Sequence, residues 1–256
     1  MRIAALSDIH GNLPALEAVL AELTGERVDL IVNLGDILAG PLWPRETAAL
    51  LMQQGWPTIA GNHERQMLDA RAQSPSDAFA ARALTEAQRG WLAALPGGAL
   101  LGEVQLTHGS PRSDLEYLLE TVTGGAHPGV RAATRGEVAE RLGHPSGHHA
   151  AALVLCGHSH VPRLMALDGA LIVNPGSVGL PAYDHDQPHE HVVENGSPHA
   201  RWALVERKAG RWQAQLRATA YDWDAAAARA EANGRGDWAD ALASGFVGRT
   251  ERSLAG

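Results

Sequence analysis

The chain has 256 residues, of which 45% are hydrophobic and 20% are charged, and this ordinary composition excludes the disordered and fibrous classes. Its formal net charge of -8 argues against broad nonspecific binding to nucleic acid or to an anionic membrane surface. No stretch reaches the ~18 consecutive apolar residues that span a bilayer. The first residues do not form a signal-type segment, so we expect a cytoplasmic protein that does not associate with a membrane.

The first half of the chain alternates predicted strands and helices. Apolar runs predict strands at residues 3–6, 30–34 and 57–60. Helical patterns occupy residues 13–23, 45–54 and 64–95. Asn12 is a suitable N-cap for the first helix, with Pro14 in its first turn, and a break near residues 74–76 divides the third. This alternation is typical of an α/β fold.

The second half of the chain is richer in strands. Apolar runs predict strands at residues 104–107, 153–156 and 171–173, and two more at 201–206 and 211–219. The last two flank a turn at residues 208–210, which is the pattern of a hairpin. Two stretches, near residues 123–150 and 183–199, follow neither period and are expected to be irregular surface insertions. We therefore expect a single domain over residues 1–256 with these two insertions.

Short clusters of metal-type side chains follow the apolar runs directly. There are five of them: Asp8-Ile9-His10, Gly35-Asp36, Gly61-Asn62-His63, His108 and Gly157-His158-Ser159-His160. Residues that follow buried strands of an open α/β sheet collect at one edge, where such folds bind ligands. Any one cluster alone is more often a turn, but five in chain order indicate a shared site.

The spacing within the clusters favours a site for two metal ions. Asp8 and His10 are separated by one residue, so in an extended segment both side chains point the same way, and the same holds for His158 and His160. Asp36 has two carboxylate oxygens, with which it can bridge two cations. The sequence therefore predicts a two-metal site at the strand ends.

These clusters, together with Asn174-Pro175-Gly176-Ser177, resemble the complete motif series of the calcineurin-like metallophosphoesterases. The resemblance runs from the first residues to Ser177. The tail, in which Tyr221-Asp222-Trp223-Asp224 opens a final Ala-rich helix, is similar to the small bacterial and archaeal phosphodiesterase-like branch. The resemblance implies a four-layer α-β-β-α sandwich of two mixed β-sheets flanked by helices.

The resemblance also implies a role for each residue of the clusters. The first metal ion would be bound by Asp8, His10, Asp36 and His160. The second would be bound by Asp36, Asn62, His108 and His158. His63 stays free of metal beside the substrate, and the catalytic group comprises His63, Asp36 and Asn62.

Such a centre suits the hydrolysis of phosphate esters. Two divalent ions carry more charge than two carboxylates and a bridging hydroxide remove, so the centre stays positive and can bind phosphoryl oxygens. The hypothesis is attack by the bridging hydroxide, while His63 stabilises the transferring group or protonates the leaving alkoxide. Ligands of nitrogen and oxygen without thiolate leave Mn, Fe, Zn, Ni and Co open, with Mn favoured by the resemblance.

Two departures from known patterns bear on the substrate. Residues 37–40 lack the Asp and Arg that follow Gly-Asp in protein Ser/Thr phosphatases, which disfavours a phosphoprotein and leaves His63 without an identified carboxylate partner. Ala182 stands where the branch commonly has a basic residue. We therefore expect a small phosphate-ester substrate, nucleotide-like, with a phosphodiester favoured over a phosphomonoester.

Two other functions and the oligomeric state stay open from the sequence. One alternative is a catalytically weak or inactive interaction module on the same fold, which would be expected to lack some of the ligands. The other is a nuclease, which the acidic balance disfavours. Both a monomer and a homo-oligomer are compatible with the composition.

Several reactive side chains are left over by this assignment. The single cysteine, Cys156, ends an apolar run and is interpreted as a buried structural thiol. Arg112 could contact phosphate or lie on the surface, and these interpretations are equally favoured. The histidines at 144–149 and 185–199 are interpreted as solvated loop residues.

Overall fold

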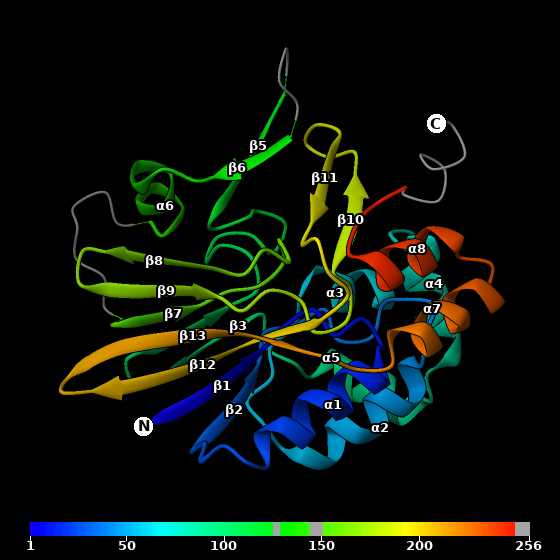
Figure 1. Ribbon diagram of the computed structural model, residues 1–256, viewed down its shortest axis with the longest axis horizontal. Coiled ribbons are helices and arrows are strands. Elements are labelled where there is room, and N and C mark those ends of the chain that lie inside the picture. Colours follow the sequence, from blue (N-terminus) through cyan, green and yellow to red (C-terminus); the bar gives the residue numbers. More distant parts are fainter. Residues whose placement is uncertain (125–128, 144–150, 249–256) are drawn as a thin grey trace.

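The computed structural model describes residues 1–124, 129–143 and 151–248, and two β-sheets form its centre (Figure 1). Sheet A contains β1 (Arg2–Leu6), β2 (Leu30–Asn33), β12 (Ala200–Lys208) and β13 (Arg211–Thr219), in the order β13-β12-β1-β2. Sheet B contains β3 (Gly98–Leu101), β4 (Val104–Thr107), β7 (Leu153–Leu155), β8 (Arg163–Leu167) and β9 (Ala170–Asn174), in the order β3-β4-β7-β9-β8. Both sheets combine parallel and antiparallel pairs.

Alternating side chains of the central strands divide the core into layers. In β1, Ile3 and Ala5 pack between the two sheets, whereas Ala4 and Leu6 face the helices on the outer side of sheet A. This outer side is covered by α1 (Leu13–Leu23) and α2 (Pro44–Gln54). The outer side of sheet B packs against α6 (Arg135–Arg141), whose Val138 is fully buried. The predicted α-β-β-α sandwich of two mixed sheets is confirmed.

Three helices replace the single broken helix expected over residues 64–95. They are α3 (Asn62–Leu68), α4 (Pro75–Ala83) and α5 (Glu86–Ala93). Ser74 caps α4, because its side chain accepts from the backbone N–H of Asp77. Thr85 caps α5 in the same way and accepts from the N–H of Gln88. The break expected near residues 74–76 is therefore the start of α4, and a further break lies between α4 and α5.

The C-terminal part of the described chain contains two helices, where the sequence suggests one. They are α7 (Trp223–Ala232) and α8 (Gly236–Ser244), which pack against each other on the right of Figure 1. Trp238 and Leu242 of α8 pack with Leu42 and Leu180 from the loops at the sheet edge. This helix pair therefore lies beside the ends of the strands.

Several predicted local structures differ from those observed. Residues 57–60 form no strand, because Pro57 cannot donate to a ladder and only Thr58 makes a bridge, to Asn33. The segments expected to be irregular contain α6 and two hairpins, which are β5 (Glu120–Thr123) with β6 (Gly129–Ala132) and β10 (Ala182–His185) with β11 (His191–Glu194). These strands have four residues each and polar sequences, so they show little hydrophobic periodicity.

None of the helices in the described ranges combines the length and the apolar character needed to cross a membrane. His144, His148 and His149, for which the sequence predicts solvated loops, lie outside the described residues.

Candidate functional site

The candidate ligands meet at one edge of the two sheets because parallel strands end there. Within sheet A, β1 runs parallel to β2, and within sheet B, β4 runs parallel to β7. Backbone bonds join the loops that follow these strands. The N–H of Asp8 donates to the carbonyl of Gly35 (3.0 Å), and the N–H of Gly157 donates to that of His108 (2.7 Å). Loops that are far apart in the sequence are thus fixed side by side.

The structure brings six of the seven predicted ligands into two groups. Asp8, His10 and His160 form one, and Asp36, His108 and His158 form the other; the ligand atoms within each group lie within 4.8 Å of one another. The seventh, Asn62, lies beside the second group, with its Oδ1 3.2 Å from Nε2 of His108. Its Nδ2 donates to Gln66, so the oxygen faces the ligand groups.

Hydrogen bonds to the backbone fix the orientation of three imidazole rings. The Nδ1–H groups of His10, His108 and His160 donate to backbone carbonyl oxygens, at distances of 2.7, 2.8 and 2.8 Å. A carbonyl can only accept, so Nε2 is the ring nitrogen left facing the site, and it presents a lone pair there whenever the ring is neutral. This is the arrangement typical of metal-ligating histidines.

The buried acceptors of the first group fit a cation. Nε2 of His10 and Nε2 of His160 lie 3.1 Å apart, although both carry lone pairs when their rings are neutral. Among the residues that the structure describes, the buried Oδ1 of Asp8 has no hydrogen-bond partner. Burial lowers the pKa of His10 to about 4, with the nearby charge of His160 acting in the same direction, so this ring stays neutral at pH 7. A divalent ion among these atoms would satisfy them together.

The two acidic ligands are carboxylates despite full burial. Burial acts to raise the pKa of Asp36, but the positive charges of His108 and His63 hold this pKa well below its usual value. The pKa of Asp8 is also lowered, because His160 outweighs the effect of burial. Both groups can therefore offer negative oxygens to a metal ion.

Most of the candidate ligands adopt a left-handed backbone conformation. Of the seven non-glycine residues described with positive φ, five are candidate ligands, namely Asp8, His10, Asp36, His158 and His160. Their φ values lie between 52° and 67°. Such a conformation is unfavourable for residues with a Cβ atom and persists where surrounding contacts impose it, often at functional sites.

Two glycines of the motifs are required by close approach. A Cβ atom at Gly61 would lie 2.2 Å from Oδ1 of Asp36, and one at Gly35, whose φ is +97°, would lie 2.5 Å from the backbone nitrogen of Gly61. Glu64 holds these loops together by accepting from the N–H groups of Asp36, Ile37 and Gly61 at 2.8 to 2.9 Å. The Gly-Asp and Gly-Asn-His-Glu motifs are therefore packed as one unit.

His63 has the carboxylate partner that the sequence left unidentified. Nδ1 of His63 lies 2.7 Å from Oδ1 of the buried Asp77, in the first turn of α4. Burial acts to lower the pKa of His63, but the negative charges of Asp36 and Asp77 outweigh it and raise the pKa to about 9. The capping pattern Ser74-x-x-Asp77 marks the start of α4 in the sequence but does not indicate that the carboxylate of Asp77 reaches His63.

A pair of tyrosines was missed by sequence reasoning. The hydroxyl groups of Tyr117 and Tyr183 lie 2.5 Å apart, and that of Tyr117 lies 3.0 Å from Nε2 of His191. The ring of Tyr117 lies 4.9 Å from that of His158, and the ring of Tyr183 lies 4.7 Å from that of His160. His191 is buried on β11, so its interpretation as a solvated loop residue is wrong.

The ligand groups open into a large cavity of about 1630 Å³. His63, Asn62 and both histidines of the 158–160 motif line it, together with residues of α7, α8 and β10.

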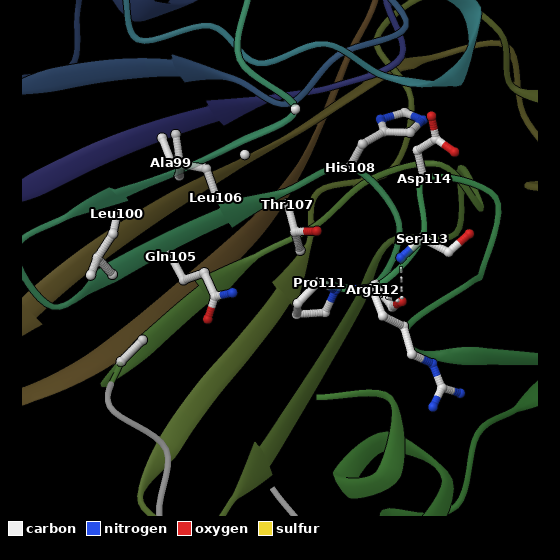
Figure 2. Close-up of a pocket in the computed structure, with 14 residues that line it drawn as sticks. Ala99, Leu100, Gln105, Leu106, Thr107, His108, Pro111, Arg112, Ser113 and Asp114 are labelled. Carbon is white, nitrogen blue, oxygen red and sulfur yellow. Dashed lines mark hydrogen bonds between the residues drawn. The ribbon is translucent and has the colours of Figure 1, made fainter. Parts of the chain in front are cut away.

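A second, smaller pocket lies over β3, β4 and the loop after β4 (Figure 2). Arg112 lines this second pocket and forms an ion pair with Glu116 at 2.6 Å, with its guanidinium directed away from His108 (Figure 2). Of its two interpretations, the surface arginine is the one observed.

Cys156 lies fully buried in the core between sheet B and α6, with burial raising the pKa of its thiol well above the usual value. The interpretation as a structural thiol is in agreement with this position.

Comparison with known proteins places this arrangement in a family. The family model described as calcineurin-like phosphoesterase superfamily domain matches residues 1–194. The crystal structure of a metallophosphoesterase from Sphaerobacter thermophilus is similar over 96% of this chain and 100% of its own, with a TM-score of 0.74 and 27% sequence identity. The protein PH1004 from Pyrococcus horikoshii OT3 has the same fold over 96% of this chain and 99% of its own, with a TM-score of 0.72 and 18% identity.

A sequence relative comes from an archaeon. The protein MJ0912 of Methanocaldococcus jannaschii, itself described as uncharacterised, is 24% identical over 210 residues, which are 76% of this chain and 75% of that protein. Together with the family model and the fold, these matches show that the chain belongs to the calcineurin-like phosphoesterase superfamily.

Proposed function

We propose that the protein is a dinuclear metal-dependent phosphoesterase that hydrolyses a small, nucleotide-like phosphodiester, with phosphomonoesters as poorer substrates. The observation that carries this proposal is the pair of ligand groups, and in the first of them buried acceptors face one another without enough donors. Such a group of lone pairs is destabilising unless cations occupy it. The large cavity above them gives a substrate access.

Seven residues would hold the two ions. Asp8, His10 and His160 would bind one, Asn62, His108 and His158 would bind the other, and Asp36 would bridge them. When bound, the two ions supply positive charge for phosphoryl oxygens and lower the pKa of a coordinated water. The ligands are nitrogen and oxygen atoms, which suits Mn, Fe, Zn, Ni and Co, and Mn is our first choice for assays.

His63 would supply the proton that the leaving group needs. Asp77 accepts from Nδ1–H, which leaves Nε2–H of the protonated ring available to the cavity. In the hydrolysis, an O–P bond to water forms, the ester P–O bond breaks, and a proton passes from Nε2 to the departing alkoxide. The water's proton then restores the imidazolium, so the residue is unchanged after each turnover. Bound cations near the ring would lower its pKa from about 9 towards the working pH.

The rival interpretation as an inactive interaction module is disfavoured by the completeness of this arrangement. A binding module has no need of ligands held at positive φ, nor of a His–Asp pair at the cavity. A nuclease is disfavoured by the net charge of -8.

The test is hydrolysis of bis(nitrophenyl) phosphate and nitrophenyl phosphate by protein loaded with Mn, with metal content measured on the same sample. We expect faster release of nitrophenolate from the diester, and none after treatment with a chelator. A protein that binds two ions per chain and hydrolyses neither compound would contradict the proposal.

A further inference from the structure

The walls of the cavity surround the groups that are attached to the reacting phosphate of a bound ester. We call the seven candidate ligands the floor: Asp8, His10, Asp36, Asn62, His108, His158 and His160. We call the lining residues in the ranges 115–122, 182–188 and 227–248, together with Arg141, the outer wall. Two elements of the outer wall, β10 and α8, lie side by side in Figure 1 and are in contact.

Carboxylates outnumber cationic side chains in the outer wall. Its acidic members are Glu116, Glu120, Asp184, Glu231, Asp237 and Asp240. Its arginines are Arg141 and Arg235, and the one lysine of the chain, Lys208, is at the end of β12 and does not line the cavity. The described part of the outer wall is therefore acidic.

Both arginines already have partners. Arg141 donates to the carbonyl oxygens of Leu118 and Glu120 and to the hydroxyl of Thr121. Arg235 donates through Nε and Nη2 to the carboxylate of Asp237, at 2.8 and 2.6 Å. Its Nη1 donates to the hydroxyl of Ser76 at 2.8 Å, and its guanidinium lies over the ring of Trp238. Neither arginine is available as a clamp for an additional phosphate without losing these bonds.

Two of the carboxylates have no counter-charge. Within the described ranges, Asp184 on β10 and Glu231 on α7 are exposed and take part in no ion pair. Glu116, Glu120 and Asp237 are instead paired with Arg112, Arg163 and Arg235. The uncompensated negative charge thus comes from two different elements of the outer wall.

The wall also contains aromatic side chains. Tyr117, Tyr183 and Trp238 all line the cavity. Trp238 is held edge-on to His10, with 5.8 Å between the ring centroids, and the two tyrosines are joined through their hydroxyl groups. Aromatic side chains of this kind bind flat, neutral groups such as nucleobases, and also cations.

We propose that the substrate carries one phosphate group only, attached to neutral or cationic groups, and that compounds with a second phosphate are excluded by the outer wall. This inference rests on the proposed function, because the floor must bind the reacting phosphate. A second phosphate would lie outside the floor, where the uncompensated negative charges of Asp184 and Glu231 repel it. Dinucleoside polyphosphates and nucleoside polyphosphates are thereby disfavoured.

The test compares two substrates that differ by one phosphate. They are the nitrophenyl ester of thymidine 5′-phosphate and the same ester with an additional 3′-phosphate. In both, water adds to the 5′-phosphorus, the P–O bond to nitrophenol breaks, and nitrophenolate is released. We expect the 3′-phosphate to lower kcat/KM by about tenfold at low ionic strength, with a smaller difference at high salt. Equal or higher kcat/KM for the 3′-phosphorylated ester would overturn the inference.

Charge-reversal variants identify the origin of the discrimination. Glu231→Lys and Asp184→Lys change the outer wall, and Glu17→Lys makes the same charge change on the exposed face of α1, away from the cavity. We expect at least one of the wall variants to reduce the ratio of kcat/KM between the ester without and the ester with the 3′-phosphate. The control should leave this ratio unchanged. The inference fails if the control reduces the ratio as much as both wall variants do.

A binding measurement separates this inference from the proposed function. Titration calorimetry with thymidine 5′-phosphate and thymidine 3′,5′-bisphosphate, on protein loaded with Mn, reports the discrimination without turnover. If neither ester is hydrolysed but the monophosphate binds more tightly, the proposed function fails and the inference stands. Tighter binding of the bisphosphate contradicts the inference, whatever the activity.

Discussion

The floor of the cavity contains six buried candidate ligands and the partly buried His158, whereas the outer wall exposes carboxylates such as Asp184 and Glu231. Five floor residues have positive φ, and none of the described outer-wall residues other than glycine does. Floor residues are oriented by backbone carbonyls and by Glu64, while the free carboxylates of the wall have no such partners. The floor residues are thus held in place by surrounding contacts, whereas Asp184 and Glu231 of the wall are not.

The two regions also differ in their relation to the family. Every floor residue lies within residues 1–194, which match the family model, whereas α7 and α8 follow that range. The floor therefore lies in the part of the chain that is shared with the family. The wall, which is built partly from other segments, would determine the substrate of this particular chain.

The largest loss of activity is expected from a substitution in the floor that removes a ligand of both ions. Asp36→Asn removes a negative charge from the proposed bridging ligand, so we expect loss of bound metal and a decrease in kcat of about 10³-fold or more. Metal analysis and kcat on the same sample measure this. Retention of two ions with near-normal kcat would mean that Asp36 is no bridging ligand.

His63→Ala tests whether a residue at the floor can be catalytic without binding metal. We expect metal content to stay unchanged and kcat to decrease by about 10² to 10³-fold, because general-acid assistance is lost. Loss of metal from this variant would show that His63 is a ligand.

A smaller effect is expected from the partner of His63. Asp77→Asn removes one of the charges that raise the pKa of this ring, so the pKa falls from about 9 and the protonated ring is lost at a lower pH. The basic limb of the pH–kcat profile should therefore move to lower pH, with a decrease in kcat of about tenfold. Asp69→Asn, which changes a partly exposed carboxylate just after α3, is the control and should leave the profile unchanged.

A still smaller change is expected where the wall supports the floor. Tyr183→Phe keeps the ring against His160 but removes the hydroxyl that meets Tyr117. We expect kcat to decrease by only a few-fold, about the value of one hydrogen bond, and Tyr183→Ala to cost more. Equal effects of the two substitutions would show that the ring contact does not position His160.

No measurable effect is expected from the pocket over β3 and β4. Arg112→Ala breaks an exposed ion pair with Glu116, and such pairs contribute about 0 to 1 kcal/mol to stability. The kcat/KM for the nitrophenyl diester should stay within about twofold of the wild-type value. A loss of tenfold or more would assign Arg112 to substrate binding and extend the functional region beyond the cavity.

Periodicity predicted the strands that are buried on both faces, such as β1 and β7, because their apolar runs are continuous. It missed the edge strands β3 and β8 and the short hairpin strands β5, β6, β10 and β11, all of which have positions that are exposed or only half-buried. In Pro57–Ala60 it predicted a strand that the missing N–H of Pro57 prevents from extending.

The sequence by itself determined the types of side chain at the strand ends, and with them the family and the ligand set to be tested. It could do so because each cluster is local, a few residues that follow one strand. Only the tertiary structure decided which groups act on one another across the chain. Asp77 reaches His63 from 14 residues away, Tyr183 reaches Tyr117 from 66, and the charges of the outer wall come from separate elements. Such contacts have no local period, because they depend on how the sheets, hairpins and helices pack together.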